Sequence, residues 1–192
     1  MKRWGLLAGI LLLFAVTASA QEEISKVDVF AGYSYIRVSQ SGIPGFNMNG
    51  GSASFSYNPT EWLGLVGDFG GYHVGKIDGV SVDGNMYSYM FGPKLMMHRG
   101  RWTPFVQGLF GGAHATGSVS ISPGAVRPQG IGPVLFGSVS EDAFAMAIGG
   151  GLDVNATKHI GVRLVQAEYF MTRFISDTQN NARISAGVVF RW

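Results

Sequence analysis

The sequence predicts an all-β protein: an eight-stranded antiparallel up-and-down transmembrane β-barrel that follows a cleaved signal peptide. Three observations lead to this fold class. The chain has 29 glycines in 192 residues and only 14% charged residues, against about 25% in ordinary soluble domains. After residue 20 no run approaches the roughly 20 apolar residues of a membrane helix. Apolar residues instead alternate with small or polar ones, as on strands, where successive side chains point to opposite faces.

The first 20 residues have the features of a secretory signal peptide. Lys2 and Arg3 precede an apolar run over 4–16, and Ala-Ser-Ala at 18–20 is a small-x-small cleavage pattern. We expect cleavage after residue 20 and one barrel domain over 21–192. An uncleaved anchor helix is the alternative, for which the run is short. Loss of the two cations leaves equal numbers of acidic and basic residues, so the mature chain lacks the basic excess of nucleic-acid-binding proteins.

Eight segments show the alternation, each of about 10–14 residues, which suits the roughly 9–11 residues of a tilted membrane strand better than the roughly 5–6 of a soluble one. In one of them Phe144 and Ile148 share a bulky face, while Ala145 and Ala147 share a small face. We expect the bulky faces to meet lipid and the small faces to fill a narrow interior. The segments are 27–38, 48–57, 62–74, 85–97, 103–116, 142–154, 160–171 and 182–192.

The connections between these segments are expected to alternate between long and short, beginning with a long one. Bacterial outer-membrane barrels have this order, with short periplasmic turns and longer external loops. Lipid offers no hydrogen-bond partner to a sheet edge, so the sheet must close on itself. The expected connections are 39–47, 58–61, 75–84, 98–102, 117–141, 155–159 and 172–181.

Two places depart from the strand pattern. Pro93 lies inside a segment although it cannot donate a ladder hydrogen bond, and a bulge is expected there. In the segment 160–171, Arg163 and Glu168 fall on opposite parities. Either one of them lies outside the bilayer core, or a bulge between Val165 and Ala167 resets the register. We favour the bulge.

Charged residues on the inward faces are the candidate site residues. They are Asp28, Asp68, Lys94, Asp153, Arg163, Glu168, Arg183 and Arg191. One interpretation is a polar pore or a proton path. The other is a salt-bridged plug that fixes the register, and we favour it because eight strands leave little room for a channel. Barrel closure predicts a contact between Asp28 and Arg191, and the turn 155–159 predicts a diagonal contact between Asp153 and Arg163.

The sequence contains no recognisable catalytic or metal-binding motif, and the chain has no cysteine. His98 and His159 are expected in turns at one barrel end, and His73 and His114 near the other end, so they cannot converge on one metal. The phrase nearest to a histidine–serine motif is His-Ala-Thr, which begins at His114 and lacks the serine. A serine nucleophile also needs a base and an orienting acid within reach, and no such trio is visible in the sequence. We therefore expect no enzyme activity, no metal and no cofactor.

The C-terminal run Val-Val-Phe-Arg-Trp at 188–192 resembles the terminal signal of outer-membrane barrels, and the segment 27–35 resembles their first strand. With the phrases 91–94 and 103–105, the chain is similar to the OmpA-like or porin-like small outer-membrane β-barrel family over residues 24–192. This resemblance implies location in the cell outer membrane. It also implies an assembly signal that the barrel assembly machinery reads, formed by Val188, Phe190 and Trp192.

Two classes of function remain open. The first is a structural or surface-interaction barrel, and the second is a minor pore or small-molecule conduit. A soluble lipocalin-like carrier and a lipid A-modifying enzyme are further alternatives. The expected partners are outer-membrane lipid, lipopolysaccharide and the assembly machinery, with no nucleic acid, and the expected state is a monomer. External loops would carry any recognition, and their composition indicates no particular ligand.

Overall fold

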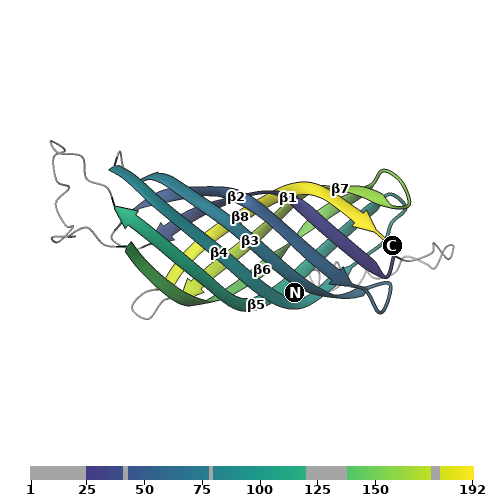
Figure 1. Cartoon of the computed structure of the whole chain (residues 1–192). Coiled ribbons are helices and arrows are strands. Elements are labelled where there is room, and N and C mark those ends of the chain that lie inside the picture. Colours follow the sequence, from purple (N-terminus) through teal and green to yellow (C-terminus); the bar gives the residue numbers. More distant parts are fainter. Residues whose placement is uncertain (1–24, 41–42, 78–79, 120–137, 174–177) are drawn as a thin grey trace, which may run out of the picture.

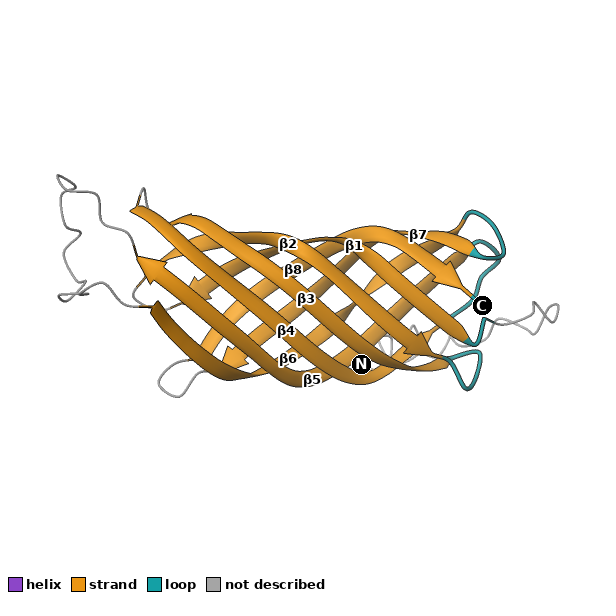
Figure 2. Cartoon of the chain, in the orientation of Figure 1, coloured by secondary structure: helices purple, strands orange, loops and turns teal. Residues whose placement is uncertain are grey.

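The structure, a computed structural model, describes residues 25–40, 43–77, 80–119, 138–173 and 178–192. They form a closed barrel in which each strand pairs antiparallel with the next (Figures 1 and 2). Its strands are β1 (Val27–Gln40), β2 (Ile43–Tyr57), β3 (Leu63–Ile77), β4 (Val80–Met96), β5 (Trp102–Val119), β6 (Ser138–Asn155), β7 (Ile160–Arg173) and β8 (Thr178–Arg191). The backbones of Val27 and Trp192 exchange two hydrogen bonds of 2.9 Å where β1 meets β8. The predicted eight-stranded antiparallel barrel is confirmed.

The two ends of the barrel differ, and each is named here by its connections. The turn end carries residues 58–62, 97–101 and 156–159 together with Val27 and Trp192. The loop end is the opposite one, where β5 ends and β6 begins (Figure 1). At the turn end, Gly100 has a φ of 57°, a conformation that glycine adopts without the steric cost that a Cβ would bring.

The predicted alternation of connection lengths is wrong for three of the four connections at the loop end. β1 runs to Gln40 and β2 starts at Ile43, so only 41–42 separate them, and only 78–79 separate β3 from β4. Residues 174–177 separate β7 from β8. Most residues expected in long loops therefore belong to strands that continue beyond the alternating apolar segments. The long connection expected at 117–141 shortens to 120–137, which lies outside the described residues.

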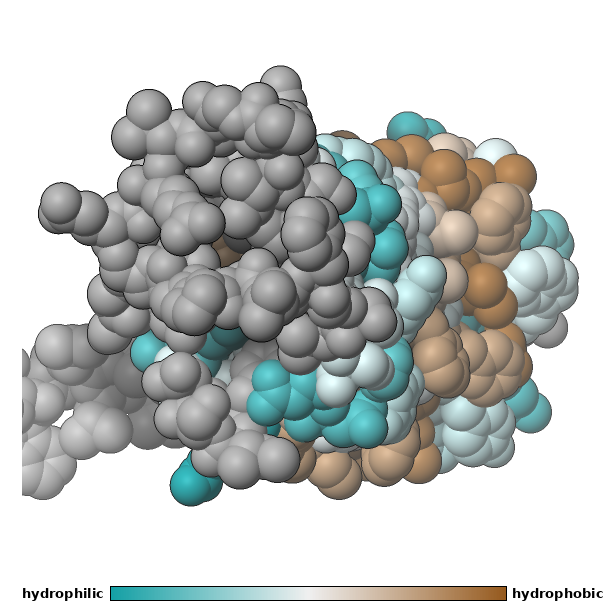
Figure 3. Space-filling model, turned by 60° about the vertical axis from the view of Figure 1, so that its left-hand side comes forward, coloured by the Kyte–Doolittle hydropathy of each residue, from teal (hydrophilic) through white to brown (hydrophobic). Residues whose placement is uncertain are grey.

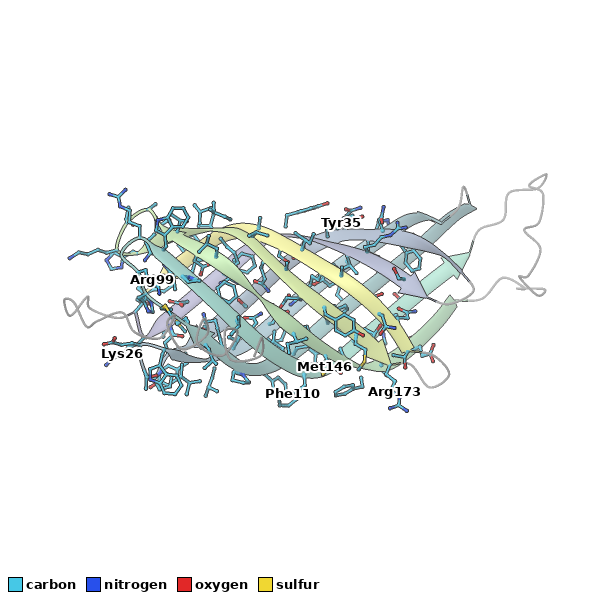
Figure 4. The ribbon with its side chains drawn as sticks, turned by 180° about the vertical axis from the view of Figure 1, so that it is seen from behind. Lys26, Tyr35, Arg99, Phe110, Met146 and Arg173 are labelled. Carbon is cyan, nitrogen blue, oxygen red and sulfur yellow. The ribbon has the colours of Figure 1, made fainter. Side chains whose placement is uncertain are left out.

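The bulky faces point outward and the small or polar faces point inward, as predicted. Phe144 and Ile148 are 49% and 59% exposed, whereas Ala145 and Ala147 are fully buried. Apolar residues gather over the wall, with hydrophilic residues between them and the loop end (Figure 3). Phe110, on β5, projects from the wall away from the barrel axis (Figure 4). No helix in the described part of the chain is long and apolar enough to cross a membrane.

Register explains the two irregular places. Pro93 pairs with Leu65 without any shift, and the register of β4 on β5 is the same on both sides of it, so the bulge expected at Pro93 is wrong. A bulge does occur in β7, between Arg163 and Gln166, slightly nearer the turn end than expected. Leu164 and Val165 both face outward there, which turns the interior face from odd-numbered to even-numbered residues.

Candidate functional site

Five of the predicted interior charges form a chain of alternating sign near the turn end, which we call the basal cluster: Lys94, Asp28, Arg191, Asp153 and Arg163. Lys94 Nζ lies 3.4 Å from Asp28 Oδ2, and Arg191 Nε lies 3.6 Å from Asp28 Oδ1. Arg191 Nη2 also donates to Asp153 Oδ2 at 3.1 Å. Arg163 binds both oxygens of Asp153, at 2.8 and 3.2 Å. The cluster thereby links β4, β1, β8, β6 and β7 across the interior.

The two pairings predicted across strands are both present in the basal cluster. Asp28 is the register partner of Arg191 at the seam that closes the barrel. Asp153 pairs with Arg163, although directly opposite it and not diagonally as expected. The direct pairing arises because the β7 bulge begins just after Arg163 and shifts the register by one residue.

The other three charges form the central cluster, with Arg183 between Asp68 and Glu168. Arg183 Nη1 donates to Asp68 Oδ1 at 2.7 Å, and Arg183 Nε donates to Glu168 Oε2 at 2.6 Å. Arg183 Nη1 also reaches the hydroxyl of Tyr72 at 3.1 Å, and Gln107 donates to Glu168 Oε1 at 2.8 Å. The arginine side chain is completely buried. Its partners Asp68 and Tyr72 come from β3 and Glu168 from β7, while Gln107 binds Glu168 from β5.

The two clusters balance each other in formal charge. The basal cluster has three cations and two acids, and the central cluster has one cation and two acids. All eight side chains are at most 7% exposed. A buried charge is tolerated when an opposite charge and hydrogen bonds compensate for its lost hydration. The eight charges together are neutral and each has an opposite charge beside it, although Arg183 Nη2 and Arg191 Nη1 are buried without a hydrogen-bond partner among the described residues.

Aromatic rings lie against cations in both clusters. The guanidinium carbon of Arg163 lies 4.3 Å from the ring centre of Phe30 and 4.4 Å from that of Phe105. Arg183 lies 5.6 Å from the ring centre of Phe170. A cation over an aromatic face gains electrostatic energy, more so when water is excluded. These rings also fill the space beside the charges, so each cluster is enclosed by side chains on several sides.

Several interior contacts were not foreseen from the sequence. The hydroxyls of Ser34 and Ser52 lie 2.6 Å apart, and those of Ser34 and Ser185 lie 2.7 Å apart. Toward the loop end the interior becomes apolar. The residues of this apolar group include Ile36, Val38, Met48, Val74, Met86, Met90 and Phe170. The alternation in the sequence predicts that these residues face inward. It does not predict their contacts, which depend on the register between strands that are distant in the sequence.

The outer wall near the loop end carries polar pairs that join neighbouring strands. Tyr33 donates to Asn49 at 2.6 Å, and Arg37 donates to Asn47 at 2.7 Å. His114 Nδ1 lies 2.7 Å from Asp142 Oδ1. These exposed pairs begin where the outward apolar residues end. Beyond that point the outward residues are polar, so the sequence no longer alternates between apolar and polar residues, and the strands were predicted too short.

The remaining histidines do not come together. His98 and His159 lie at the turn end, and His159 Nδ1 is 3.1 Å from the carbonyl oxygen of Arg191. His73 Nδ1 is 3.1 Å from Asn85 Oδ1 on the next strand. Among the described residues, no group of three or more histidine and acidic side chains could hold a metal ion.

The three residues of the predicted C-terminal signal lie on the outer wall at the turn end. Val188 and Phe190 are each 38% exposed, and Trp192 is 62% exposed. The rings of Phe190 and Trp192 stack, with centroids 6.2 Å apart. Lys26 and Arg99 lie at the same end, whereas Arg173 lies toward the loop end (Figure 4).

Comparisons with known proteins agree with this architecture. The model of the outer membrane protein beta-barrel domain matches residues 6–191. The structure is similar to Ail, the attachment invasion locus protein of Yersinia pestis, with a TM-score of 0.62 and 19% identity over 87% of this chain and 99% of that one. It is also similar to Neisserial surface protein A, with a TM-score of 0.62 and 15% identity over 88% of this chain and 98% of that one.

No curated protein matches the chain. The match to the family model covers nearly the whole sequence, and the closed barrel has the outward apolar wall that a bilayer requires. The chain therefore belongs to the family of the outer membrane protein beta-barrel domain and is an integral protein of the outer membrane.

Proposed function

We propose that the protein is a non-conducting barrel with a structural or surface-interaction role. The observation that carries this proposal is the interior plug formed by the basal and central clusters. The eight charges of the two clusters come from every strand except β2 and β5. β5 contributes Gln107, which binds Glu168, and β2 contributes Ser52 to the neighbouring serine group. A pore would need charged side chains facing water, whereas Arg183 is completely buried and Lys94 is 3% exposed.

The loop end supports the surface-interaction part of this proposal. β5 and β6 have 18 residues each, which at about 3.3 Å per residue and about 40° of tilt span about 45 Å, against an apolar band about 25 Å tall. These strands therefore lift polar side chains well clear of the bilayer. Two proteins with the same fold are named for attachment and for the cell surface, and Ail has also been solved with a heparin analogue.

The turn end supports the proposed biogenesis. We propose that residues 1–20 are removed on export and that the barrel assembly machinery reads Val188, Phe190 and Trp192, whose side chains are exposed on the outer wall. Outer-membrane lipid surrounds the apolar wall, with lipopolysaccharide next to the polar pairs at the loop end. The barrel acts as a monomer, because its sheet is closed and no strand edge remains for a second copy.

No catalysis is assigned to the interior. Each of the eight buried charges pairs with another of them, so none is left to act on a substrate. The proposed plug instead fixes the register of the strands, in keeping with the best-attested use of buried charge.

Conductance in planar lipid bilayers tests the proposal. The folded chain should give no reproducible unit steps. A variant with Asp68, Glu168 and Arg183 all replaced by serine removes the central cluster and should conduct more than the unaltered chain. Reproducible unit steps from the unaltered chain would favour the alternative, a minor pore.

A further inference from the structure

A serine, a histidine and an aspartate meet on the outer wall at the loop end. Ser140 Oγ lies 3.2 Å from His114 Nε2, and His114 Nδ1 lies 2.7 Å from Asp142 Oδ1. The two ring nitrogens of one imidazole therefore contact a hydroxyl on one side and a carboxylate on the other. This is the order of contacts in a nucleophile, general base and orienting acid.

Strand register brings these residues together. His114 on β5 is directly opposite Asp142 on β6, and Ser140 precedes Asp142 by two residues on β6, so all three side chains share the outward face. In the sequence, Ser140 comes 26 positions after His114. The absence of a serine beside His114 in the sequence therefore did not show that the trio is absent from the fold.

The hydrogen-bond partners of His114 determine which of its ring nitrogens carries the proton. The carboxylate of Asp142 accepts, so His114 carries its proton on Nδ1. His114 Nε2 then holds a lone pair and accepts the hydrogen of the Ser140 hydroxyl. This tautomer is the one in which histidine can remove a proton from serine. The His114 side chain is 40% exposed and that of Asp142 is 81% exposed, so a substrate can reach them.

We propose that Ser140, His114 and Asp142 form the catalytic trio of a serine esterase. Ser140 Oγ attacks the carbonyl carbon of a carboxylic ester, and its proton passes to His114 Nε2. The C–O bond to the alcohol then breaks, and the alcohol leaves with that proton. Water, activated by His114, attacks the acyl-serine, releases the carboxylic acid and returns the proton to Ser140 Oγ.

The height of the trio on the wall indicates the class of substrate. His114 is about 30 Å from the turn end at Trp102, at about 3.3 Å per residue and about 40° of tilt, and the apolar band is about 25 Å tall. The trio therefore lies level with the head groups of the outer leaflet. An ester linkage of a lipid in that leaflet can reach it sideways, with its acyl chain along the apolar wall.

The neighbouring side chains suit this approach. Thr116 is the register partner of Ser140 and Tyr87 that of His114, so a hydroxyl from each lies on the same face. These are the candidate donors to a developing oxyanion. Toward the turn end, the next outward residue on β5 is Gly112. The ring of Tyr89 lies over this glycine, because a Cβ built at Gly112 would be 2.5 Å from the Tyr89 hydroxyl oxygen. The trio thus borders an aromatic wall on its membrane side.

The test uses the full chain expressed in a Gram-negative host and purified as the folded barrel in mixed micelles. One readout is hydrolysis of p-nitrophenyl palmitate, and p-nitrophenyl acetate serves as the soluble comparison. The second is labelling by a fluorophosphonate, which forms a P–O bond to an activated serine and loses fluoride. Ser140→Ala and His114→Gln should each lower palmitate hydrolysis about 100-fold or more and abolish labelling. Asp142→Asn should lower hydrolysis about 10-fold or more.

The matched controls are Ser39→Ala, an exposed serine on the same outer wall, and His73→Gln. Among the described residues, His73 has Asn85 and Asp83 as partners and no hydroxyl. Both controls should hydrolyse and label like the unaltered chain, and heat-modifiable mobility on gels should show that every variant folds. Equal hydrolysis and labelling in Ser140→Ala and the unaltered chain would overturn the trio. Trio-dependent hydrolysis that favours the acetate would overturn the lipid substrate.

Discussion

The barrel interior and the outer wall at the loop end use the same kinds of polar side chain in opposite surroundings. Inside, Arg183 is completely buried between Asp68 and Glu168. Outside, His114 and Asp142 are 40% and 81% exposed. Burial makes each interior charge depend on its partners, whereas water screens the outer pair and makes its electrostatic energy small. The interior groups thus hold the fold, and the outer groups are free to do chemistry.

The largest expected effect comes from Arg183→Ala. This change leaves Asp68 and Glu168 buried without their shared cation, which we expect to lower the free energy of unfolding by about 3–5 kcal/mol. Urea titration of the barrel in phospholipid vesicles, followed by tryptophan fluorescence, measures it. The triple variant Arg183→Met, Asp68→Asn and Glu168→Gln removes the charges together and should recover most of the loss. A loss below about 1 kcal/mol for Arg183→Ala would mean that the interior is hydrated.

A charge placed on the apolar part of the outer wall should have the next largest effect. Ile148 is 59% exposed, in the middle of the outward residues of β6, so Ile148→Arg should cost about 2–4 kcal/mol near the bilayer midplane. Thr178→Arg, at the loop end of β8, is the matched control and should cost about 0–1 kcal/mol. The same vesicle titration compares them. Equal costs at both positions would contradict the assignment of the lipid-facing band.

Within the interior, the ion pair at the seam between β1 and β8 should contribute less to stability than the ion pairs of Arg183. Asp28 and Arg191 are 3.6 Å apart, and each has a second partner in the basal cluster, Lys94 and Asp153 respectively. A double-mutant cycle with Asp28→Asn and Arg191→Gln should therefore give a coupling of about 1 kcal/mol, well below the effect at Arg183. Coupling indistinguishable from zero would show that the seam is held by backbone pairing alone.

The sequence predicted the eight strands and their faces because lipid outside and packed side chains inside give every strand a two-residue period. It did not predict where the strands end. Beyond the apolar band the outward residues become polar, as at Arg37 and Asn47, and the alternation disappears although the pairing continues. The β7 bulge was expected, but Leu164 and Val165 are both apolar, so the sequence could not show which residue was extra.

Parity placed the eight charges on the inward face, but their partners depend on register. Arg183 meets Asp68, 115 residues away in the chain, because the arginine reaches across the interior from β8 to β3. The spacing of residues along the sequence does not predict this contact. Ser140 and His114 are likewise neighbours only because β5 and β6 pair in one particular register. What the sequence lacks in both regions is the alignment of strands, not the identity of the residues.

Changes to the exposed pair of His114 and Asp142 should have the smallest effect on stability, and they distinguish the outer wall from the interior most directly. His114→Gln and Asp142→Asn each disrupt an exposed pair on the outer wall, and exposed pairs contribute about 0–1 kcal/mol. The free energy of unfolding in vesicles should therefore change by less than about 1 kcal/mol, while fluorophosphonate labelling of Ser140 falls in both variants. A residue that only stabilised the fold would show the reverse, a large loss of stability and labelling unchanged in the molecules that remain folded. Measuring both quantities on the same samples thus decides whether the outer pair supports structure, as the interior charges do, or prepares Ser140 for reaction.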